Sequence, residues 1–125
     1  MTVACLCAAW CTTCEAYRTA FQASARAHAD VRHLWVDIED HADALEATIG
    51  GAPDIDNFPT LLVLRGSQPG FYGTVLPHAS VLERLILQSR EGHLPALRDP
   101  TVVSLGRVVR ALADSGILDT NSDDR

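Results

Sequence analysis

A short apolar run at the start of the chain leads directly into two cysteines that are separated by two residues. Residues 2–8, TVACLCA, carry no charge and show no helical period, which is typical of a strand buried on both faces. From about Thr12 to Ala29 the pattern becomes helical, with Tyr17 and Phe21 on one face. The chain must therefore pass from a buried strand into a helix at Cys11, and this limits the possible folds more than any other feature.

The spacing of Cys11 and Cys14 predicts redox chemistry at this turn. Cys11 would cap the helix and Cys14 would lie one turn further on, on the same side, with the two sulfurs close enough to form a disulfide. Unpaired N–H groups and the partial positive charge of a helix N-terminus favour a thiolate at Cys11. We therefore predict that Cys11 is the nucleophile that attacks a disulfide and that the more buried Cys14 resolves the mixed disulfide.

The remaining pattern predicts one α/β domain. A second strand is expected over residues 31–37, a helix capped by Asp40 that runs to Ile49, a third strand over 60–64, a turn over 65–70, a returning strand over 71–76 and a helix over 79–88. The first half is a βαβ unit, which requires a right-handed crossover and a parallel strand pair. We expect a mixed four-stranded sheet flanked by helices on both faces.

The character of the chain changes after Gly92. Prolines bracket a linker, and Asp99 followed by Pro100 predicts the start of a C-terminal helix. The expected organisation is a domain over residues 1–92, a linker and amphipathic helix over 93–118, and a flexible tail over 119–125. The apolar stripe of the helix consists of Val102, Leu105, Val109 and Leu112, joined by Leu118. Either the chain's own sheet edge or a second subunit would cover this stripe, and we favour a homodimer.

Composition excludes several functional classes. The 125 residues carry a net charge of −6, and all ten basic residues are arginine, so lysine-based chemistry is excluded and binding to nucleic acid or to an anionic membrane surface is disfavoured. No apolar run is long enough to span a bilayer, and the first nine residues lack the basic region of a signal peptide. We therefore expect a cytoplasmic protein, in which cysteines are catalytic or metal-binding rather than a structural disulfide framework.

Four cysteines occur close together, which raises zinc binding as an alternative. Cys5 and Cys7 lie two residues apart on a strand, so they share a face, and that face could be the one directed away from the helix start. Structural zinc sites draw their ligand pairs from separated segments, so we predict no metal and no other cofactor. Cys5 and Cys7 are interpreted as small buried apolar residues. A second possibility is that Cys5 lies behind Cys14 and exchanges with it.

Three short segments together resemble the thioredoxin family. They are Trp10-Cys11-Thr12-Thr13-Cys14 after a buried strand, Val36-Asp37 at the end of the next strand, and Phe58-Pro59-Thr60 at the start of a third. The similarity covers roughly residues 2 to 90 at the level of element order. It implies the thioredoxin fold and an active-site pair at Cys11 and Cys14. It also implies a cis Pro59 that faces this pair, and a substrate groove formed by Trp10, Phe58 and Pro59.

The implied activity is thiol–disulfide exchange with protein disulfide substrates and a dithiol reductant. The sequence also departs from the family pattern. The family's first strand and helix are missing before the motif, Thr12-Thr13 replaces the usual Gly-Pro, and Cys5 stands where the family has a buried acid. His33 falls where a lysine often lies, and we interpret it as a packed polar residue. The alternative function is a non-enzymatic thioredoxin-fold module that binds a partner through the Trp10/Pro59 groove.

Overall fold

The structure is a computed structural model that describes residues 1–8, 10–48 and 58–114. Its elements, in chain order, are β1 (Thr2–Cys7), α1 (Thr12–Ala27), β2 (Arg32–Asp37), α2 (Ala42–Leu45), β3 (Thr60–Arg65), β4 (Gln68–Thr74), α3 (Ala79–Arg90) and α4 (Pro100–Asp114). This order agrees with the order that the hydrophobic pattern predicts. None of the helices in the described ranges is long and apolar enough to cross a membrane.

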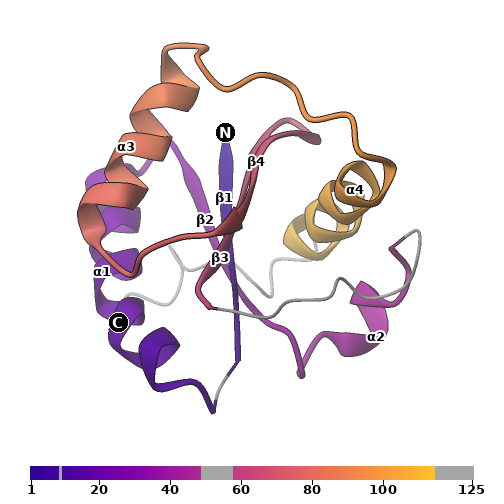
Figure 1. Ribbon diagram of the computed structural model, residues 1–125, viewed down its shortest axis with the longest axis horizontal. Coiled ribbons are helices and arrows are strands. Elements are labelled where there is room, and N and C mark those ends of the chain that lie inside the picture. The colour runs from indigo at the N-terminus through magenta and orange to yellow at the C-terminus, as the bar shows by residue number, and fades with distance from the viewer. Residues whose placement is uncertain (9, 49–57, 115–125) are drawn as a thin grey trace.

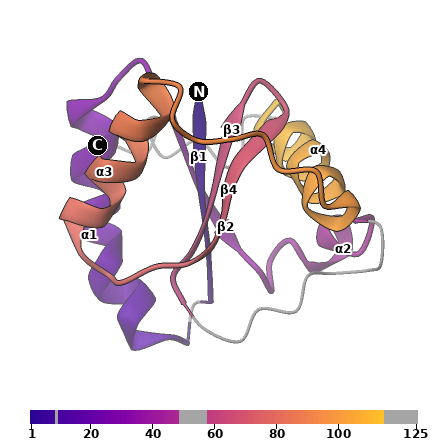
Figure 2. The same cartoon turned by 45° about the horizontal axis from the view of Figure 1, so that its top comes forward.

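The four strands form one mixed sheet in the order β2-β1-β3-β4. β1 pairs in parallel with β2 and antiparallel with β3, and β3 pairs antiparallel with β4. Helices α1 and α3 cover one face of the sheet, while α2 and α4 cover the other (Figures 1 and 2). The predicted α/β class, the four-stranded mixed sheet and the helices on both faces are therefore confirmed.

Two apolar cores lie on the two faces of the sheet, and β1 contributes alternate residues to each. Val3, Cys5 and Cys7 belong to the first core, beneath α1 and α3. Ala4 and Leu6 belong to the second core, beneath α2 and α4. All six residues of β1 are buried, which confirms the prediction of a strand covered on both sides.

Helix α4 packs against the face of the chain's own sheet. The Asp99 carboxylate accepts hydrogen bonds from the backbone N–H groups of Thr101 (2.9 Å) and Val102 (3.2 Å), which confirms the predicted N-cap. Leu105 and Val109 are fully buried in the second core. The stripe is therefore covered by a sheet face, where a sheet edge or a second subunit was expected. A homodimer through α4 stays a prediction, and Leu118 lies outside the described residues.

A glycine allows α4 to approach the sheet closely. A Cβ atom at Gly106 would lie 3.1 Å from a side-chain carbon of Leu64 and 3.1 Å from the backbone oxygen of Ser67. Such distances are shorter than ordinary van der Waals contacts, so a larger residue would push the helix away from the turn between β3 and β4.

The turn between β3 and β4 is tighter than the sequence pattern predicts. The expected turn over residues 65–70 is replaced by Gly66 and Ser67 alone, and Gly66 adopts a φ of 63° that favours glycine. Strand β4 therefore starts at Gln68 and includes Pro69, which is tolerated because β4 is an edge strand. The linker covers this edge, since the backbone N–H of Leu97 donates to the Pro69 carbonyl at 2.8 Å.

Helix α2 is shorter than predicted, and the Asp37 side chain explains its late start. The Asp37 carboxylate accepts hydrogen bonds from the backbone N–H groups of Glu39 (2.9 Å) and Asp40 (3.1 Å). Asp40 therefore belongs to the turn after β2, and His41 occupies the N-cap position in its place. The predicted end of this helix, at Ile49, lies outside the described residues.

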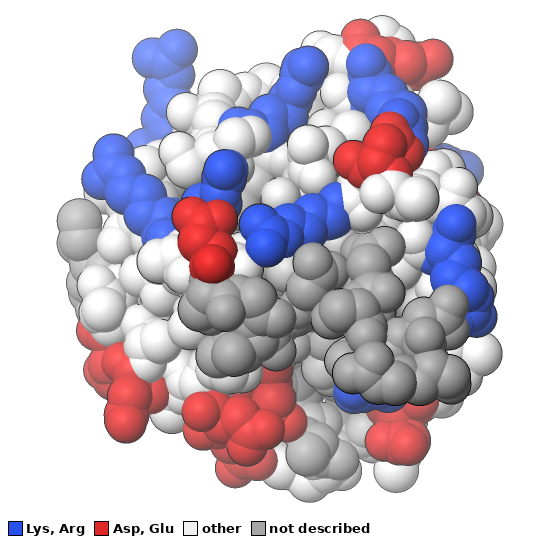
Figure 3. All heavy atoms as spheres, turned by 180° about the vertical axis from the view of Figure 1, so that it is seen from behind, with Lys and Arg blue, Asp and Glu red and all other residues white. Residues whose placement is uncertain are grey.

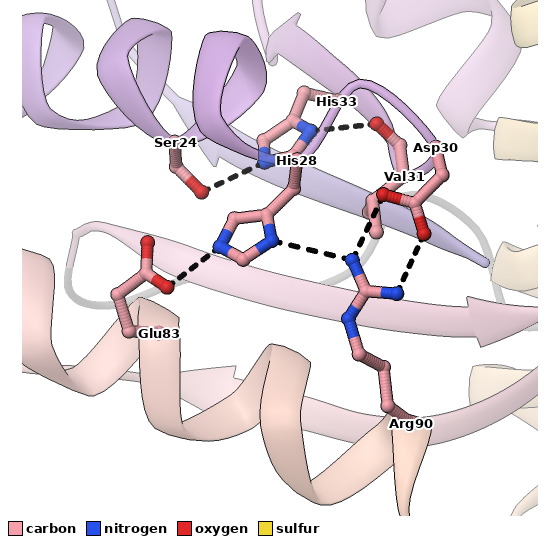
Figure 4. A network of polar contacts seen from close by, with 7 residues as sticks. All are labelled: Ser24, His28, Asp30, Val31, His33, Glu83 and Arg90. Carbon is pink, nitrogen blue, oxygen red and sulfur yellow. Dashed lines mark hydrogen bonds and ion pairs between the residues drawn. The ribbon is translucent and has the colours of Figure 1, made fainter.

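A polar network joins the C-terminal end of α1 to α3 (Figure 4). The Arg90 guanidinium donates two hydrogen bonds to the Asp30 carboxylate, at 2.6 and 2.9 Å, and a third to Nδ1 of His28 at 3.2 Å. Because His28 Nδ1 accepts a hydrogen bond, its Nε2 carries the proton and donates to Glu83 at 2.6 Å. The hydrogen bonds from Arg90 lower the pKa of Asp30 to about 2.

His33 is a packed polar residue, as predicted. It is fully buried beneath α1, where its Nδ1 lies 2.9 Å from the Val31 carbonyl and its Nε2 lies 2.9 Å from the Ser24 hydroxyl (Figure 4). A carbonyl only accepts, so Nδ1 carries a proton in this contact. These bonds hold β2 against α1.

Candidate functional site

Cys11 lies at the start of α1, as the sequence pattern predicts. It occupies the N-cap position with an extended backbone, and its N–H donates to the Ala8 carbonyl at 3.0 Å. Its own carbonyl accepts the hydrogen bond of Glu15 at 3.1 Å and so opens the helix. The thiol is free, half-buried, and makes no capping hydrogen bond. A free sulfur thus lies at the helix N-terminus, where the first N–H groups have no partner within the helix.

Cys14 forms a disulfide with Cys7 in the structure. Both residues are 1% exposed, and their Cα atoms are 5.9 Å apart. The expected partner of Cys14 was Cys11, so the observed pairing differs from the expected one. The physical reason is that Cys7 ends β1 with its side chain on the α1 face of the sheet, directly beneath the first turn of the helix.

Cys5 lies on the same face of β1 as Cys7, two residues further from the start of α1. Its sulfur is 3.5 Å from the sulfur of Cys7, and its side chain is fully buried. Cys7, and not Cys5, is bonded to Cys14, and exchange between Cys5 and Cys14 stays a prediction. Both Cys5 and Cys7 face α1 rather than away from it. Burial raises the pKa of the Cys5 thiol strongly, although the positive charge of Arg18 opposes this shift.

The structure brings two of the predicted groove residues together. The rings of Trp10 and Phe58 meet edge to face, with their centroids 5.6 Å apart, and Trp10 is 67% exposed. Phe58 and Cys11 both pack against the first core, and the contact between Trp10 and Phe58 places the start of β3 beside the start of α1. The Phe58–Pro59 peptide bond is cis, as the resemblance implies. Pro59 itself is buried, and its carbonyl accepts a hydrogen bond from Val75 at 3.0 Å.

Acidic side chains gather at the end of the molecule where α1 begins. Glu15 is exposed in the first turn of α1, and Glu39 and Asp40 are exposed just after β2. Strands β1 and β2 are parallel, so the segments that follow them meet at one edge of the sheet. Seen from behind, arginine side chains gather in the upper half and acidic side chains along the lower edge (Figure 3). This end therefore carries an excess of negative charge among the described residues.

No group of three or more histidine, cysteine or acidic residues is placed to hold a metal ion within the described ranges. Two of the four thiols that a zinc site would need, Cys7 and Cys14, are bonded to each other. The remaining two cysteines, Cys5 and Cys11, are free thiols, and the sulfur of Cys5 lies 3.5 Å from that of Cys7.

Comparison with known proteins gives no assignment. No protein-family model matches the chain, and no curated protein is significantly similar to it. The resemblance to the thioredoxin family therefore stays a prediction that depends on the residues named above.

Proposed function

We propose that this chain is a thioredoxin-like protein that exchanges thiols and disulfides through Cys11 and Cys14. One observation carries the proposal: a free, half-buried thiol at the N-cap of α1 is followed, one turn later, by a cysteine that takes part in a disulfide. The α/β architecture, with a parallel β1–β2 pair joined by α1 and a β3–β4 hairpin, supports the thioredoxin-like assignment.

The proposed reaction has two steps. The Cys11 thiolate attacks one sulfur of a protein disulfide, and the electron pair of the broken bond leaves on the other substrate sulfur. The Cys14 thiolate then attacks the sulfur of Cys11 and releases the first substrate sulfur as a second thiolate. The substrate gains two electrons, the two protein thiols become a disulfide, and a dithiol reductant returns the protein to its starting state.

Trp10 and Phe58 provide the surface on which a substrate would rest. Trp10 exposes most of its ring next to Cys11 in the sequence, and its edge contact with Phe58 holds it beside the start of β3. An exposed aromatic pair offers apolar contact area to an extended peptide. The acidic side chains around it favour substrates with basic segments.

The second candidate function is a binding module without redox activity. It is favoured by the Cys7–Cys14 disulfide, because Cys11 has no resolving thiol while Cys14 is bonded to Cys7. The exposed Trp10 and its contact with Phe58 would then serve partner binding alone.

Disulfide reduction with matched cysteine variants separates the two candidates. Insulin and dithiothreitol serve as the substrate disulfide and the dithiol reductant. Cys11→Ser is expected to lower turnover to the uncatalysed rate, and Cys14→Ser is expected to accumulate a mixed disulfide with insulin. Cys5→Ala is the matched control and should keep wild-type turnover. Equal rates in the wild type and in Cys11→Ser would reject the redox function and leave the binding module.

A further inference from the structure

The four cysteines differ in depth, from Cys11 at the helix start to Cys5 in the core. Cys11 is half-buried at the helix start, and Cys14 lies one turn further along α1 with 1% exposure. Cys14 is bonded to Cys7, and Cys7 lies 3.5 Å from the sulfur of Cys5. Only Cys11 and Cys14 take part in the reaction proposed above, so Cys7 has no assigned role although it contacts the reacting sulfur directly.

We propose that Cys7 is a second resolving cysteine, which displaces Cys11 from Cys14 and leaves the oxidised protein with a buried Cys7–Cys14 disulfide and a free Cys11 thiol. This inference rests on the proposed function, because the Cys11–Cys14 disulfide is its starting point. It explains why Cys14 is bonded to Cys7 of β1 rather than to Cys11 at the N-cap of α1.

The step is an isomerisation without net oxidation. The substrate disulfide is the oxidant and has already accepted two electrons when the Cys11–Cys14 bond forms. Cys7 then loses its proton and attacks the sulfur of Cys14. A bond between Cys7 and Cys14 forms as the bond between Cys14 and Cys11 breaks, and the electron pair leaves on Cys11, which takes up the proton.

Disulfide exchange stops at Cys7 and does not continue to Cys5, for geometric reasons. Cys5 and Cys7 lie two residues apart on one strand, which separates their Cα atoms by about 6.6 Å, near the upper limit for a disulfide. Cys5 therefore stays a thiol, and Cys5→Ala is a matched control for Cys7→Ala on the same face of the same strand.

Because the final disulfide is buried, both its formation and its reduction proceed through Cys11. Cys7 and Cys14 are each 1% exposed, so a dissolved thiol has no path to either sulfur. Reduction must then begin with the Cys11 thiolate, which reopens the bond at Cys14. Any external reductant reaches the oxidised protein through Cys11 alone.

Disulfide mapping of the wild-type chain tests the proposal without any variant. Reduced protein is treated with oxidised glutathione, quenched in acid, unfolded and alkylated with N-ethylmaleimide. Chymotrypsin cleaves after Leu6, Trp10 and Tyr17, so Cys7 falls in fragment 7–10 and the two helix cysteines fall in fragment 11–17. The expected product is fragment 7–10 linked to fragment 11–17 through Cys14, with label on Cys11. A loop closed within fragment 11–17 and label on Cys7 would overturn the inference while leaving the proposed function intact.

Two variants test whether the Cys7–Cys14 disulfide forms and opens through Cys11 or has only a structural role. Cys7→Ala should stop at the Cys11–Cys14 disulfide, so Cys11 of its oxidised native form resists alkylation, while Cys5→Ala should behave like the wild type. In Cys11→Ser, a Cys7–Cys14 bond formed during oxidative refolding should be reduced by glutathione at least about tenfold more slowly than in the wild type. Equal reduction rates would show that reduction of the Cys7–Cys14 disulfide does not require the Cys11 thiol, and would overturn the inference. Absent insulin reduction in every protein, the wild type included, would instead reject the proposed function.

Discussion

The sulfur of Cys7, at the end of β1, is bonded to the sulfur of Cys14, in the first turn of α1. This bond ties the strand to the helix across the connection that carries Trp10 and Cys11. The exposed candidate site is therefore fixed at both ends by buried residues of the first core. Redox state and the stability of this connection are coupled as a consequence.

Reduction of the Cys7–Cys14 disulfide is expected to lower the free energy of unfolding by about 2–3 kcal/mol. The bond joins residues that are seven positions apart, and closing a loop of this size removes chain entropy mainly from the unfolded state. Urea unfolding of the oxidised and the dithiothreitol-reduced protein measures the difference. In Cys7→Ala the difference should shrink, because a Cys11–Cys14 bond closes a much shorter loop. Identical midpoints for both redox states of the wild type would contradict the prediction.

The local signals in the sequence predicted most of the element order. The uncharged run before Cys11 correctly indicated a strand buried on both faces, because β1 lies between two neighbours and beneath helices on both sides. The Asp99-Pro100 cap was readable because an N-cap depends on a side chain and the two or three backbone groups that follow it. The position of Cys11 at the helix start follows from the same kind of local pattern.

The features that the sequence did not predict depend on contacts between distant elements. The pattern places Cys5 and Cys7 on one face of β1, but only the position of α1 over that face selects Cys7 as the partner of Cys14. The stripe on α4 shows that the helix must be covered, but not that the sheet of the same chain covers it. The signal for Cys7 was present, since it is the α1-facing residue closest to the helix start.

Leu105 is expected to contribute strongly to stability, because α4 closes the second core. Its side chain is fully buried among residues of β1, β2 and β3, so Leu105→Ala leaves a cavity and should cost about 2–5 kcal/mol. Leu87→Ala is the matched control, since Leu87 is 54% exposed on α3 and should change stability by no more than about 1 kcal/mol. Urea unfolding measures both variants.

Alkylation of Cys11 in the same two variants tests whether the loss of packing is confined to the second core, on the α4 side of the sheet. The labelling rate should remain that of the wild type, since α4 and Cys11 pack against different cores. A Leu105→Ala protein as stable as Leu87→Ala would mean that α4 is not part of the folded core. Sedimentation of the full-length chain tests the predicted homodimer separately.

Tyr17→Phe is expected to keep or raise stability, although it removes a polar group from the core. The Tyr17 side chain is 1% exposed, and its hydroxyl has no hydrogen-bond partner within the described part of the chain. Burial also raises the pKa of Tyr17. Removing the hydroxyl removes its desolvation cost, worth up to about 1–3 kcal/mol, while the ring keeps its contact with Phe21. Thermal unfolding measures the change, with half-buried Tyr72 as the control in Tyr72→Phe. A loss of stability in Tyr17→Phe would show that the hydroxyl is paired in solution.

The Asp30–Arg90 pair should make stability fall in strong acid. The two hydrogen bonds from Arg90 lower the pKa of Asp30 from 3.8 to about 2 in the folded protein. A carboxyl group whose pKa is lower in the folded state stabilises the protein fully above its unfolded pKa, 3.8, and loses this contribution as the pH falls through about 2. Asp30→Asn should therefore flatten the dependence of the unfolding free energy on pH between about pH 4 and 2. Its effect should be small at neutral pH, because both side chains are well exposed to solvent.

The matched control for this pair is Asp43→Asn, at an exposed carboxyl group in α2. This variant should show the same fall in unfolding free energy between about pH 4 and 2 as the wild type. Urea unfolding at a series of pH values provides the measurement, repeated at high salt. Salt should reduce the difference between the wild type and Asp30→Asn, because an exposed ion pair is screened. Parallel pH curves for the wild type and Asp30→Asn would mean that the pair does not hold the end of α1 to α3 in solution. If Asp30→Asn changed the slope of the unfolding free energy only above pH 4, the change would lie outside the pH range in which Asp30 titrates and would contradict the prediction.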